Sequence, residues 1–242
     1  MLNRVCIAVA VVGGTCGAAG LAAGAVVTFD NGLEGWQGPQ GPGGSSFIDA
    51  QDGNPANSYR TVFNNFGIDF SNSTNPAFVG DYTAAPSVTL ALDVKARQVE
   101  FFFQPVSRTM IVELRSFTLA QGTPYPWVSV WYPLGDLQGG LDWTTWSVTI
   151  GDTSSATLPS GWGGYGDEDP NTFEPRLPVG ITFADVLANV EEVSFSTYVP
   201  GFFFGFTDFD VSVDNISITA VPAPGTAGVM MLGGVAALRR RR

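Results

Sequence analysis

The chain has 242 residues, with 22 acidic and 11 basic side chains, a formal net charge of −11 and no histidine. All the acidic residues lie between Asp30 and Asp214, whereas five of the basic residues lie near the two ends of the chain. This acidic middle argues against a nucleic-acid partner, because phosphate binding needs a basic face, and it disfavours anionic lipid. The lack of histidine excludes Ser-His-Asp and Cys-His catalysis, histidine-ligated zinc and imidazole acid–base chemistry.

The first 25 residues have the features of an export signal. Arg4 precedes the apolar run Val5–Val12, and a stretch rich in glycine and alanine follows. The triplet Ala23-Gly24-Ala25 has small residues, Ala23 and Ala25, at the two positions that a signal peptidase must fit. The sequence therefore predicts a signal peptide that is cleaved after Ala25.

Two alternatives for this segment remain open. A transmembrane anchor would need about 20 apolar residues, and the strongly apolar part is shorter. Cys16 would fit a lipoprotein signal, although Thr15 before it is a poor match. Cleavage after Ala25 would also remove Cys6 and Cys16, the two cysteines of the chain. The mature domain would then have no disulfide, and its own core or a metal would hold it together.

The middle of the chain, residues 26–220, is long enough for one domain with a sizeable core. Apolar residues alternate with more polar ones, the pattern of a half-buried strand, at Val88, Leu90, Leu92 and Val94. Segments rich in Val, Ile, Phe, Thr and Trp predict further strands at 98–104, 110–118, 128–132, 143–150, 193–198 and 211–219. Several strands without alternating helices predict an all-β fold, an antiparallel β-sandwich.

Two local features interrupt the strand pattern. Apolar residues recur at helical spacing at Phe183, Val186, Leu187 and Val190. Thr182, with Asp185 three residues later, has the pattern of a helix N-cap. We therefore expect a short helix there that covers one end of the sandwich. In the last predicted strand the apolar phase changes, which predicts a β-bulge at Asp214-Asn215.

Two phenylalanine runs and two glycine-rich segments lie between these elements. The runs at 101–103 and 202–206 predict strands that are buried on both faces, and exposed adhesion patches are the alternative. The segments 38–44 and 160–178 are rich in glycine and proline. They predict loops.

Short motifs near both ends of the middle segment resemble known β-sandwich families. The stretches 29–36 (Phe-Asp-Asn-Gly-Leu-Glu-Gly-Trp) and 213–218 (Val-Asp-Asn-Ile-Ser-Ile) look like the first and last strands of bacterial carbohydrate-binding-like jelly rolls. The laminin B (domain IV) pattern is similar to 146–148, 161–162, 183–187 and 193–195. Both resemblances imply a jelly-roll-like sandwich used in binding or adhesion, and neither implies catalysis.

The jelly-roll resemblance also implies a cofactor. In many such modules a structural calcium is held by carboxylates of the first and last strands, and hard cations prefer oxygen ligands. The matching residues here are Asp30 and Asp214, with Glu34 as an addition. The alternative is that Asp30 begins a turn and that Asp214 binds the backbone at the bulge.

Aromatic side chains are the candidates for a glycan site. Apolar faces of sugars stack on Trp and Tyr, while carboxylates and amides bind the hydroxyl groups. The pool is Trp127, Trp131, Tyr132, Trp143, Trp146, Trp162 and Tyr165, most of which we expect in the core. Trp162 and Tyr165 lie in a glycine-rich segment that runs into the acidic residues 167–169, so we expect these two to be the surface pair.

Without histidine, an enzyme of this sequence would be limited to hydrolysis by paired carboxylates, because glycoside cleavage needs two acids at a fixed separation. Acidic residues are plentiful, among them Glu100, Glu113, Asp167, Glu168, Glu174 and Glu192. Their spacing distinguishes no pair. We therefore expect a protein that is not an enzyme.

The last 22 residues have the order of a sorting signal. The motif Val221-Pro222-Ala223-Pro224-Gly225-Thr226 precedes the apolar stretch 227–238, which in turn precedes Arg239, Arg240, Arg241 and Arg242. A helix over 227–238 would be roughly 18 Å long, short of the ~30 Å hydrocarbon layer, so a plain tail anchor is the weaker alternative. The positive-inside rule would keep the arginines on the cytoplasmic side and the acidic domain outside.

This tail resembles the PEP-CTERM sorting signal of bacteria. The resemblance implies that the export machinery and an exosortase, a membrane enzyme, are partners of the chain. It also implies transient membrane association through the tail, followed by delivery to the cell surface or extracellular matrix.

The combined prediction has three segments: a signal peptide at 1–25, a β-sandwich at 26–220 and a sorting tail at 221–242. The predicted function is that of an exported bacterial surface or matrix protein with a noncatalytic sandwich. The alternative is a carbohydrate-binding module with a defined glycan ligand, which would make extracellular polysaccharide a partner. A carboxylate-pair glycoside hydrolase is the third.

Overall fold

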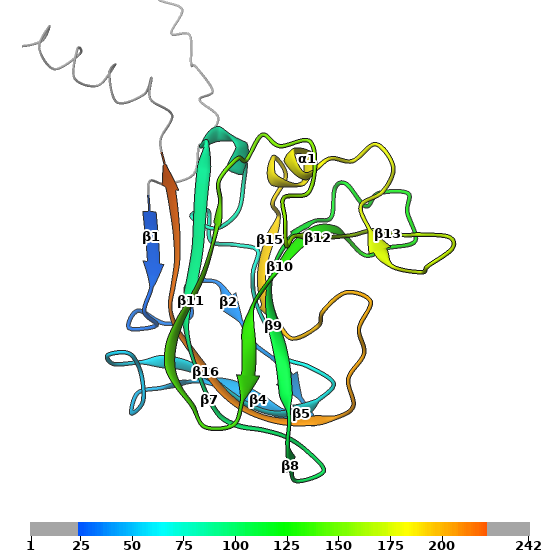
Figure 1. Ribbon diagram of the computed structural model, residues 1–242. Coiled ribbons are helices and arrows are strands. Elements are labelled where there is room, and N and C mark those ends of the chain that lie inside the picture. The colour runs from blue at the N-terminus through cyan, green and yellow to red at the C-terminus, as the bar shows by residue number, and fades with distance from the viewer. Residues whose placement is uncertain (1–23, 222–242) are drawn as a thin grey trace, which may run out of the picture.

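The computed structural model describes residues 24–221, which form a two-layer β-sandwich (Figure 1). The predicted signal peptide up to residue 23 lies outside the described residues, as do the tail residues from Pro222 onward. Ala25, after which cleavage is predicted, lies in the first strand. Within residues 24–221, no helix is long and apolar enough to cross a membrane.

Sixteen strands and two short helices follow one another along the described residues. The strands are β1 (Gly24–Val27), β2 (Trp36–Gln37), β3 (Gln40–Gly41), β4 (Gly44–Asp49), β5 (Ser58–Asn65), β6 (Asp69–Asn72), β7 (Ser87–Phe101), β8 (Gln104–Pro105), β9 (Ser107–Ser116), β10 (Val128–Gln138), β11 (Leu141–Ile150), β12 (Gly163–Tyr165), β13 (Asp167–Glu168), β14 (Pro175–Arg176), β15 (Glu192–Ser196) and β16 (Thr207–Val221). The helices are the 3-10 helix η1 (Tyr82–Ala84) and the α-helix α1 (Phe183–Leu187).

The strands build two large sheets and one small hairpin. The larger sheet has the order β11-β7-β16-β5-β4-β3, with β1 paired to β16 and β8 paired to β7. The smaller sheet has the order β12-β10-β9-β15-β6-β2, and β13 pairs with β14. Every pairing between these strands is antiparallel. The predicted antiparallel β-sandwich is confirmed.

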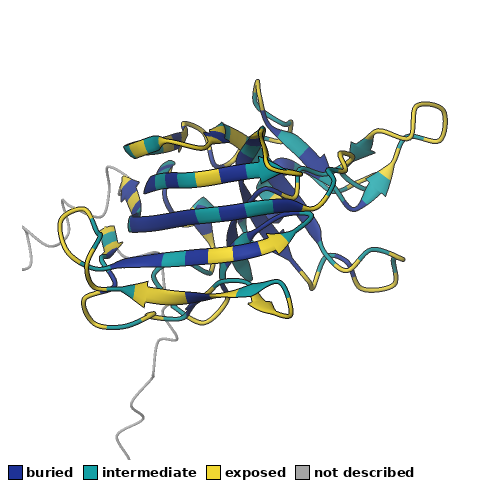
Figure 2. Ribbon diagram, turned by 90° about the horizontal axis from the view of Figure 1, so that it is seen from below, coloured by how far each residue is buried: buried dark blue, intermediate teal, exposed yellow. Residues whose placement is uncertain are grey.

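The core lies between the two sheets and follows the period-2 pattern of the strands. Alternate residues of β7, from Val88 to Val94, are fully buried, as are Met110, Val112 and Leu114 of β9. Figure 2 shows this alternation as dark and light bands along the strands of one sheet. Each large apolar side chain that is buried in this way stabilises the fold by about 1.5–3 kcal/mol.

Both predicted local features are present. Helix α1 begins after Thr182, whose hydroxyl oxygen accepts from the Asp185 backbone N–H (3.1 Å), while the Asp185 carboxylate accepts from the Thr182 N–H (2.8 Å). The helix covers one end of the sandwich (Figure 1), and its apolar side chains belong to the core. The pairing of β16 with β7 shifts register between Asp214 and Ser217, where Asn215 has a φ of 47°. The bulge prediction is therefore confirmed.

Four segments differ from the sequence-based expectation. The segments expected as loops contain short strands, β3 in the first and β12 to β14 in the second. The two phenylalanine runs were expected to be buried strands, and this prediction is wrong. Phe102 and Phe103 form the turn between β7 and β8, and Phe202 and Phe203 lie in the connection from β15 to β16, all four exposed. A continuous apolar run has no polar–apolar alternation, so the sequence pattern does not distinguish a strand from a turn. A two-residue turn depends on the backbone angles of its residues, and Phe102 and Phe103 adopt those angles.

Candidate functional site

A groove of about 310 Å³ lies on the outer face of the smaller sheet. Its floor is made by Asp69 of β6 and by Glu113 and Arg115 of β9. Its walls are aromatic and apolar side chains from three segments: Trp127 just before β10, Tyr165 at the end of β12, and Tyr198, Val199 and Pro200 after β15. The lining residues come from positions 69 to 200, so only the folded sheet brings them together.

The strand register explains this assembly. Arg115 lies opposite Ser129 of β10 and opposite Glu192 of β15. Ser129 in turn lies opposite Tyr165 of β12. Because paired residues of neighbouring strands point to the same face, these four side chains form one row across the sheet.

The floor carries charged side chains because Glu113 and Arg115 alternate with core residues in the second half of β9. Met110, Val112 and Leu114 point into the core, so Glu113 and Arg115 point to the other face. Both charged side chains are nevertheless almost completely shielded, with Glu113 1% and Arg115 4% exposed. Charged side chains that are buried at the bottom of a groove need partners, because an unpaired buried charge is costly.

Arg115 is the centre of the polar floor. Its Nη2 lies 2.7 Å from Glu113 Oε2, and its Nη1 lies 2.7 Å from Glu192 Oε1 and 3.1 Å from Asp69 Oδ2. Three carboxylates thus surround one guanidinium, which leaves an excess of negative charge. Burial lowers the pKa of Arg115, but the charges of Glu113 and Asp69 and the hydrogen bond with Glu192 raise it overall, so this side chain stays cationic.

Trp127 is held in place by the same charged groups. The Arg115 guanidinium carbon lies 4.4 Å from the centre of the indole ring, a cation–π contact. The indole N–H donates to Glu113 Oε1 (2.9 Å), which also accepts from the Ser129 hydroxyl (2.5 Å). The ring orientation is therefore fixed before any ligand arrives, which reduces the entropy lost on binding.

Two tyrosines complete the aromatic walls. The Tyr165 ring lies 6.0 Å from that of Trp127 and 5.4 Å from that of Tyr125, the latter edge-on. Tyr198 on the opposite side is 44% exposed and donates its hydroxyl to the Gly67 carbonyl (2.9 Å). Burial raises the pKa of both Tyr165 and Tyr198, and nearby carboxylates raise it further. The groove therefore presents neutral aromatic rings in a negative field.

A second groove of about 310 Å³ adjoins the first. Asp69 and Tyr198 line both grooves. The second groove is more polar and is lined in addition by Gln37, Gly38, Pro39, Gln40, Phe63, Asn65 and Ser71. Together the two grooves extend from Tyr165 at one edge of the smaller sheet towards β2 at the other.

Of the aromatic residues singled out in the sequence, Trp127 and Tyr165 line the groove. The expectation that Trp162 is a surface residue is wrong. It is 9% exposed and packs against Phe183 of α1 (5.2 Å between ring centres) and Tyr132 (5.5 Å), because the following Gly163 lets the chain pass directly over the Trp131 ring. A glycan role for Tyr165 stays a prediction.

The other aromatic candidates lie elsewhere. Trp146 packs against the core, and Trp143 lies on the outer face of the larger sheet, where it donates to Asp52 (3.2 Å). Sequence reasoning missed Tyr198, Arg115 and Asp69 as lining residues. The available signal was the pair of charged residues alternating with core residues in β9. The position of Tyr198 after β15 had no comparable signal.

The proposed calcium ligands Asp30 and Asp214 lie near the bulge of β16. Asp214 is 1% exposed and accepts from the backbone N–H groups of Asn54 (2.7 Å) and Asn215 (2.7 Å). Asp30 accepts from Thr28 (2.9 Å) and Asn57 (2.8 Å). Among residues 24–221 no group of three acidic or cysteine side chains is arranged to hold a metal ion. Calcium at these two residues stays a prediction.

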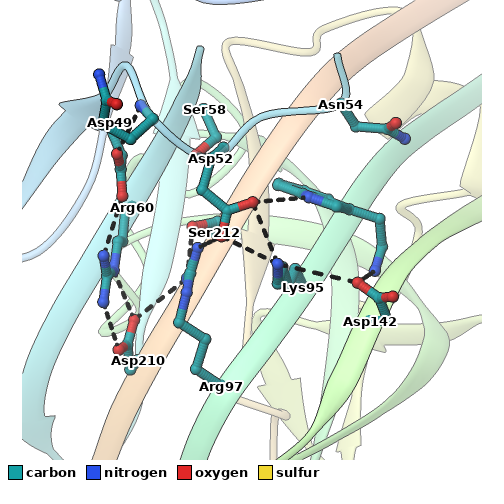
Figure 3. A network of polar contacts seen from close by, with 12 residues as sticks. Asp49, Asp52, Asn54, Ser58, Arg60, Lys95, Arg97, Asp142, Asp210 and Ser212 are labelled. Atoms are coloured by element: carbon teal, nitrogen blue, oxygen red, sulfur yellow. Dashed lines mark hydrogen bonds and ion pairs between the residues drawn. The ribbon is translucent and has the colours of Figure 1, made fainter. Parts of the chain in front are cut away.

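The outer face of the larger sheet carries a network of ion pairs instead of an aromatic groove (Figure 3). Asp52, in the connection from β4 to β5, accepts from Lys95 (3.0 Å) and also binds Arg97. Asp210 binds Arg60 (2.7 Å) and Arg97 (3.3 Å). The acidic and basic side chains of this network pair with one another, and these ion pairs hold the β4–β5 connection against the sheet.

Comparison with known proteins gave similarity to solved structures only. No protein-family model matches the chain, and no curated protein matches it. A family 11 carbohydrate-binding module of a cellulosomal cellulase from Clostridium thermocellum is 12% identical, with a TM-score of 0.47, and the match covers 86% of this chain and 99% of that one. A xylan-binding domain of family 22 is 11% identical, with a TM-score of 0.41, over 87% and 99% of the two chains.

A longer structure is also similar. It contains a family 22 module and a catalytic module of a Clostridium thermocellum xylanase in complex with xylohexaose. The identity is 12% and the TM-score 0.43, over 81% of this chain but only 28% of that chain's length. At such identities and TM-scores, the binding chemistry of this chain has to come from its own residues.

Proposed function

We propose that the sandwich is a noncatalytic module that binds a polysaccharide in the groove of the smaller sheet. The observation that carries this proposal is the set of aromatic walls, Trp127, Tyr165 and Tyr198, around the polar floor of Glu113 and Arg115. Sugars have apolar ring faces and polar edges, so they need aromatic surfaces and hydrogen-bonding groups in one site.

Free hydrogen-bonding capacity in the floor supports this reading. The Asp69 side chain lines the groove and is 27% exposed, although it is paired with Arg115. Carboxylate oxygens have two acceptor positions each, so Asp69 can accept from sugar hydroxyls while it keeps its ion pair.

The charge of the groove favours a neutral glycan over an anionic one. Three carboxylates face one guanidinium on the floor, and Glu168 lies close enough to raise the pKa of Tyr165. Polymers of uronic acids or sulfated sugars would bring more negative charge into this field, which costs free energy.

The noncatalytic part of the proposal is supported by the arrangement of the carboxylates around Arg115. Glycoside cleavage needs two carboxyl groups that face the scissile bond from opposite sides. Asp69, Glu113 and Glu192 instead all contact one guanidinium, that of Arg115.

The test is affinity electrophoresis and calorimetry with neutral polysaccharides and with polyuronates. We expect binding to one or more neutral polysaccharides and at least about tenfold weaker binding of Trp127→Ala and Tyr198→Ala, since each removes a stacking surface. Trp143→Ala is the matched control, because it removes the same kind of ring from the outer face of the other sheet. Equal loss in Trp143→Ala, or preferred binding of polyuronates, would contradict the proposal.

Export and sorting form a separate part of the proposal, which rests on the sequence of the two ends. We propose cleavage after Ala25, recognition of the tail by an exosortase-like enzyme, and delivery to the cell surface or extracellular matrix. Mass spectrometry of both termini in fractionated cells tests this. Full-length, untrimmed protein in the cytosol would contradict it, as would unchanged surface delivery after replacement of all four terminal arginines by serine.

A further inference from the structure

Eight of the 18 phenylalanines lie in three segments: just after β5, in the β7–β8 hairpin, and in the connection from β15 to β16. In Figure 1 the β7–β8 hairpin projects from one end of the sandwich, and the connection from β15 to β16 runs down to it. We name this set the phenylalanine surface; its members are Phe66, Phe101, Phe102, Phe103, Phe202, Phe203, Phe204 and Phe206.

Ring contacts join most of these residues into one surface. Phe66 lies 4.1 Å from Phe206 and 4.9 Å from Phe203 between ring centres. Phe101 packs so closely on Gly205 that a Cβ at this position would clash with its ring, and Phe102 lies 4.6 Å from Phe101 between ring centres. The projecting hairpin and the connection before β16 therefore act as one unit.

The surface is large for an isolated protein. Phe102, Phe103 and Phe203 are 77%, 84% and 77% exposed, and Phe202 and Phe206 are 65% and 52% exposed. With about 200 Å² for each phenylalanine, these five side chains expose roughly 700 Å² of aromatic surface. The largest apolar patch of a typical monomer is about 300–600 Å², and a standard interface buries about 800 Å² on each partner.

The turn at the tip of the hairpin keeps its phenylalanines at a conformational cost. Phe101 pairs with Gln104, so Phe102 and Phe103 form a two-residue turn, with φ angles of 48° and 62°. Such turns favour Asn-Gly, and each phenylalanine that adopts a positive φ there lowers the stability of the fold by about 1–2 kcal/mol. Strain of this kind is typical of residues that are kept for a role other than stability.

We infer that the phenylalanine surface is a self-association interface that binds a second copy of this chain. Its exposed area is close to what a stable dimer needs on each partner. Its shape, a projecting tip beside the rings of Phe66, Phe203 and Phe206, lets a twofold axis place the tip of each copy on those rings of the other.

Charge also favours a second copy over a lipid surface. Arg108, which lies 4.5 Å from the Phe204 ring, is 8% exposed and donates to Thr207, so it offers no free charge to lipid phosphates. Salt screens the repulsion between two acidic copies beyond about 8–10 Å, so this repulsion does not prevent an apolar contact between them.

The test is sedimentation velocity of the full chain from about 1 to 100 µM. We expect a concentration-dependent dimer that high salt does not dissociate, since salt screens the repulsion but not the apolar contact. The double variant Phe102→Asn/Phe103→Gly removes both tip rings and provides the preferred turn sequence, so it should fold at least as well. We expect its dimer dissociation constant to be at least about 100-fold higher.

Phe173→Asn is the matched control. Phe173 is 72% exposed and has a φ of 60°, as the tip residues do, but it lies in the connection between β13 and β14. The control should dimerise like the natural chain, whereas Phe203→Ser should weaken the dimer as the tip variant does. A chain that is monomeric at 100 µM would overturn the inference, as would a tip variant that still dimerises or a monomer that floats with phosphatidylcholine vesicles.

Discussion

Arg115 gives the sharpest stability prediction, because it joins three carboxylates beneath the groove. Its side chain is 5% exposed, and those of Glu113, Glu192 and Asp69 are 2%, 17% and 27% exposed. Replacing it in Arg115→Leu leaves the carboxylates facing one another without a counter-charge. Removing one partner of a buried ion pair costs about 3–5 kcal/mol. For a domain of this size, that corresponds to a melting temperature lower by about 6–20 °C.

Thermal and urea unfolding at pH 7 measure this effect. Arg176→Leu is the control: Arg176 pairs with Asp167 and Asp169 but is 40% exposed, so its loss should cost at most about 1 kcal/mol. Equal costs for the two variants would refute the reasoning.

Three further predictions concern the rest of the sandwich. Burial and neighbouring carboxylates raise the pKa of Asp214 from 3.8 to about 6, so the folded state binds this proton more tightly than the unfolded state does. We therefore expect the contribution of Asp214 to stability to rise as pH falls from 7 to 4. In urea unfolding, Asp214→Asn should lack this rise of the midpoint. The pH dependence at Asp52 has the opposite direction. Burial raises the pKa of Asp52, but hydrogen bonds from Lys95, Arg97 and Trp143 lower it to about 2, so the stability that Asp52 adds above pH 3.8 should be lost as pH falls towards 2. A natural chain that is no more acid-sensitive than Asp52→Asn would contradict this. Thr182→Ala removes the cap of α1 and should lower the free energy of unfolding by about 1 kcal/mol, whereas an unchanged melting temperature would show that the cap adds nothing.

Regular patterns in the sequence predicted the sandwich well. The alternation in β7 is visible because one face of the strand meets the core and the other does not. The capping residues of α1 and the phase change at Asp214 are equally local, since each depends on neighbours along the chain. Features of this kind can be read without knowledge of which strands pair.

The groove could be predicted only in part, because it depends on strand order. Tyr165 and Arg115 are 50 residues apart in sequence and meet only through the pairing of β12, β10 and β9. The surface prediction for Trp162 was wrong for a related reason. Its glycine-rich surroundings suggested an exposed loop, but glycine also permits close packing, and the Trp162 ring is buried in the core. Local composition indicates which backbone conformations a segment can adopt, but it does not indicate which other segments pack against it.

The phenylalanine runs show the limit of hydrophobicity as a guide to burial. Phe102 and Phe103 are 77% and 84% exposed, although their run of phenylalanines is as apolar as a core strand. Burial is decided by whether a second layer covers the segment. The β7–β8 hairpin projects past the end of the sandwich (Figure 1), so neither sheet covers its tip.

The most direct test of glycan binding in the groove is an NMR titration that follows the indole N–H signals of the tryptophans. Trp127 is the indole that lines the groove, and its N–H is bonded to Glu113. We predict that a neutral polysaccharide or its oligomers shift the Trp127 signal and leave that of Trp143, on the outer face of the other sheet, unchanged. A ligand that shifts Trp143 and not Trp127 would contradict the proposed site.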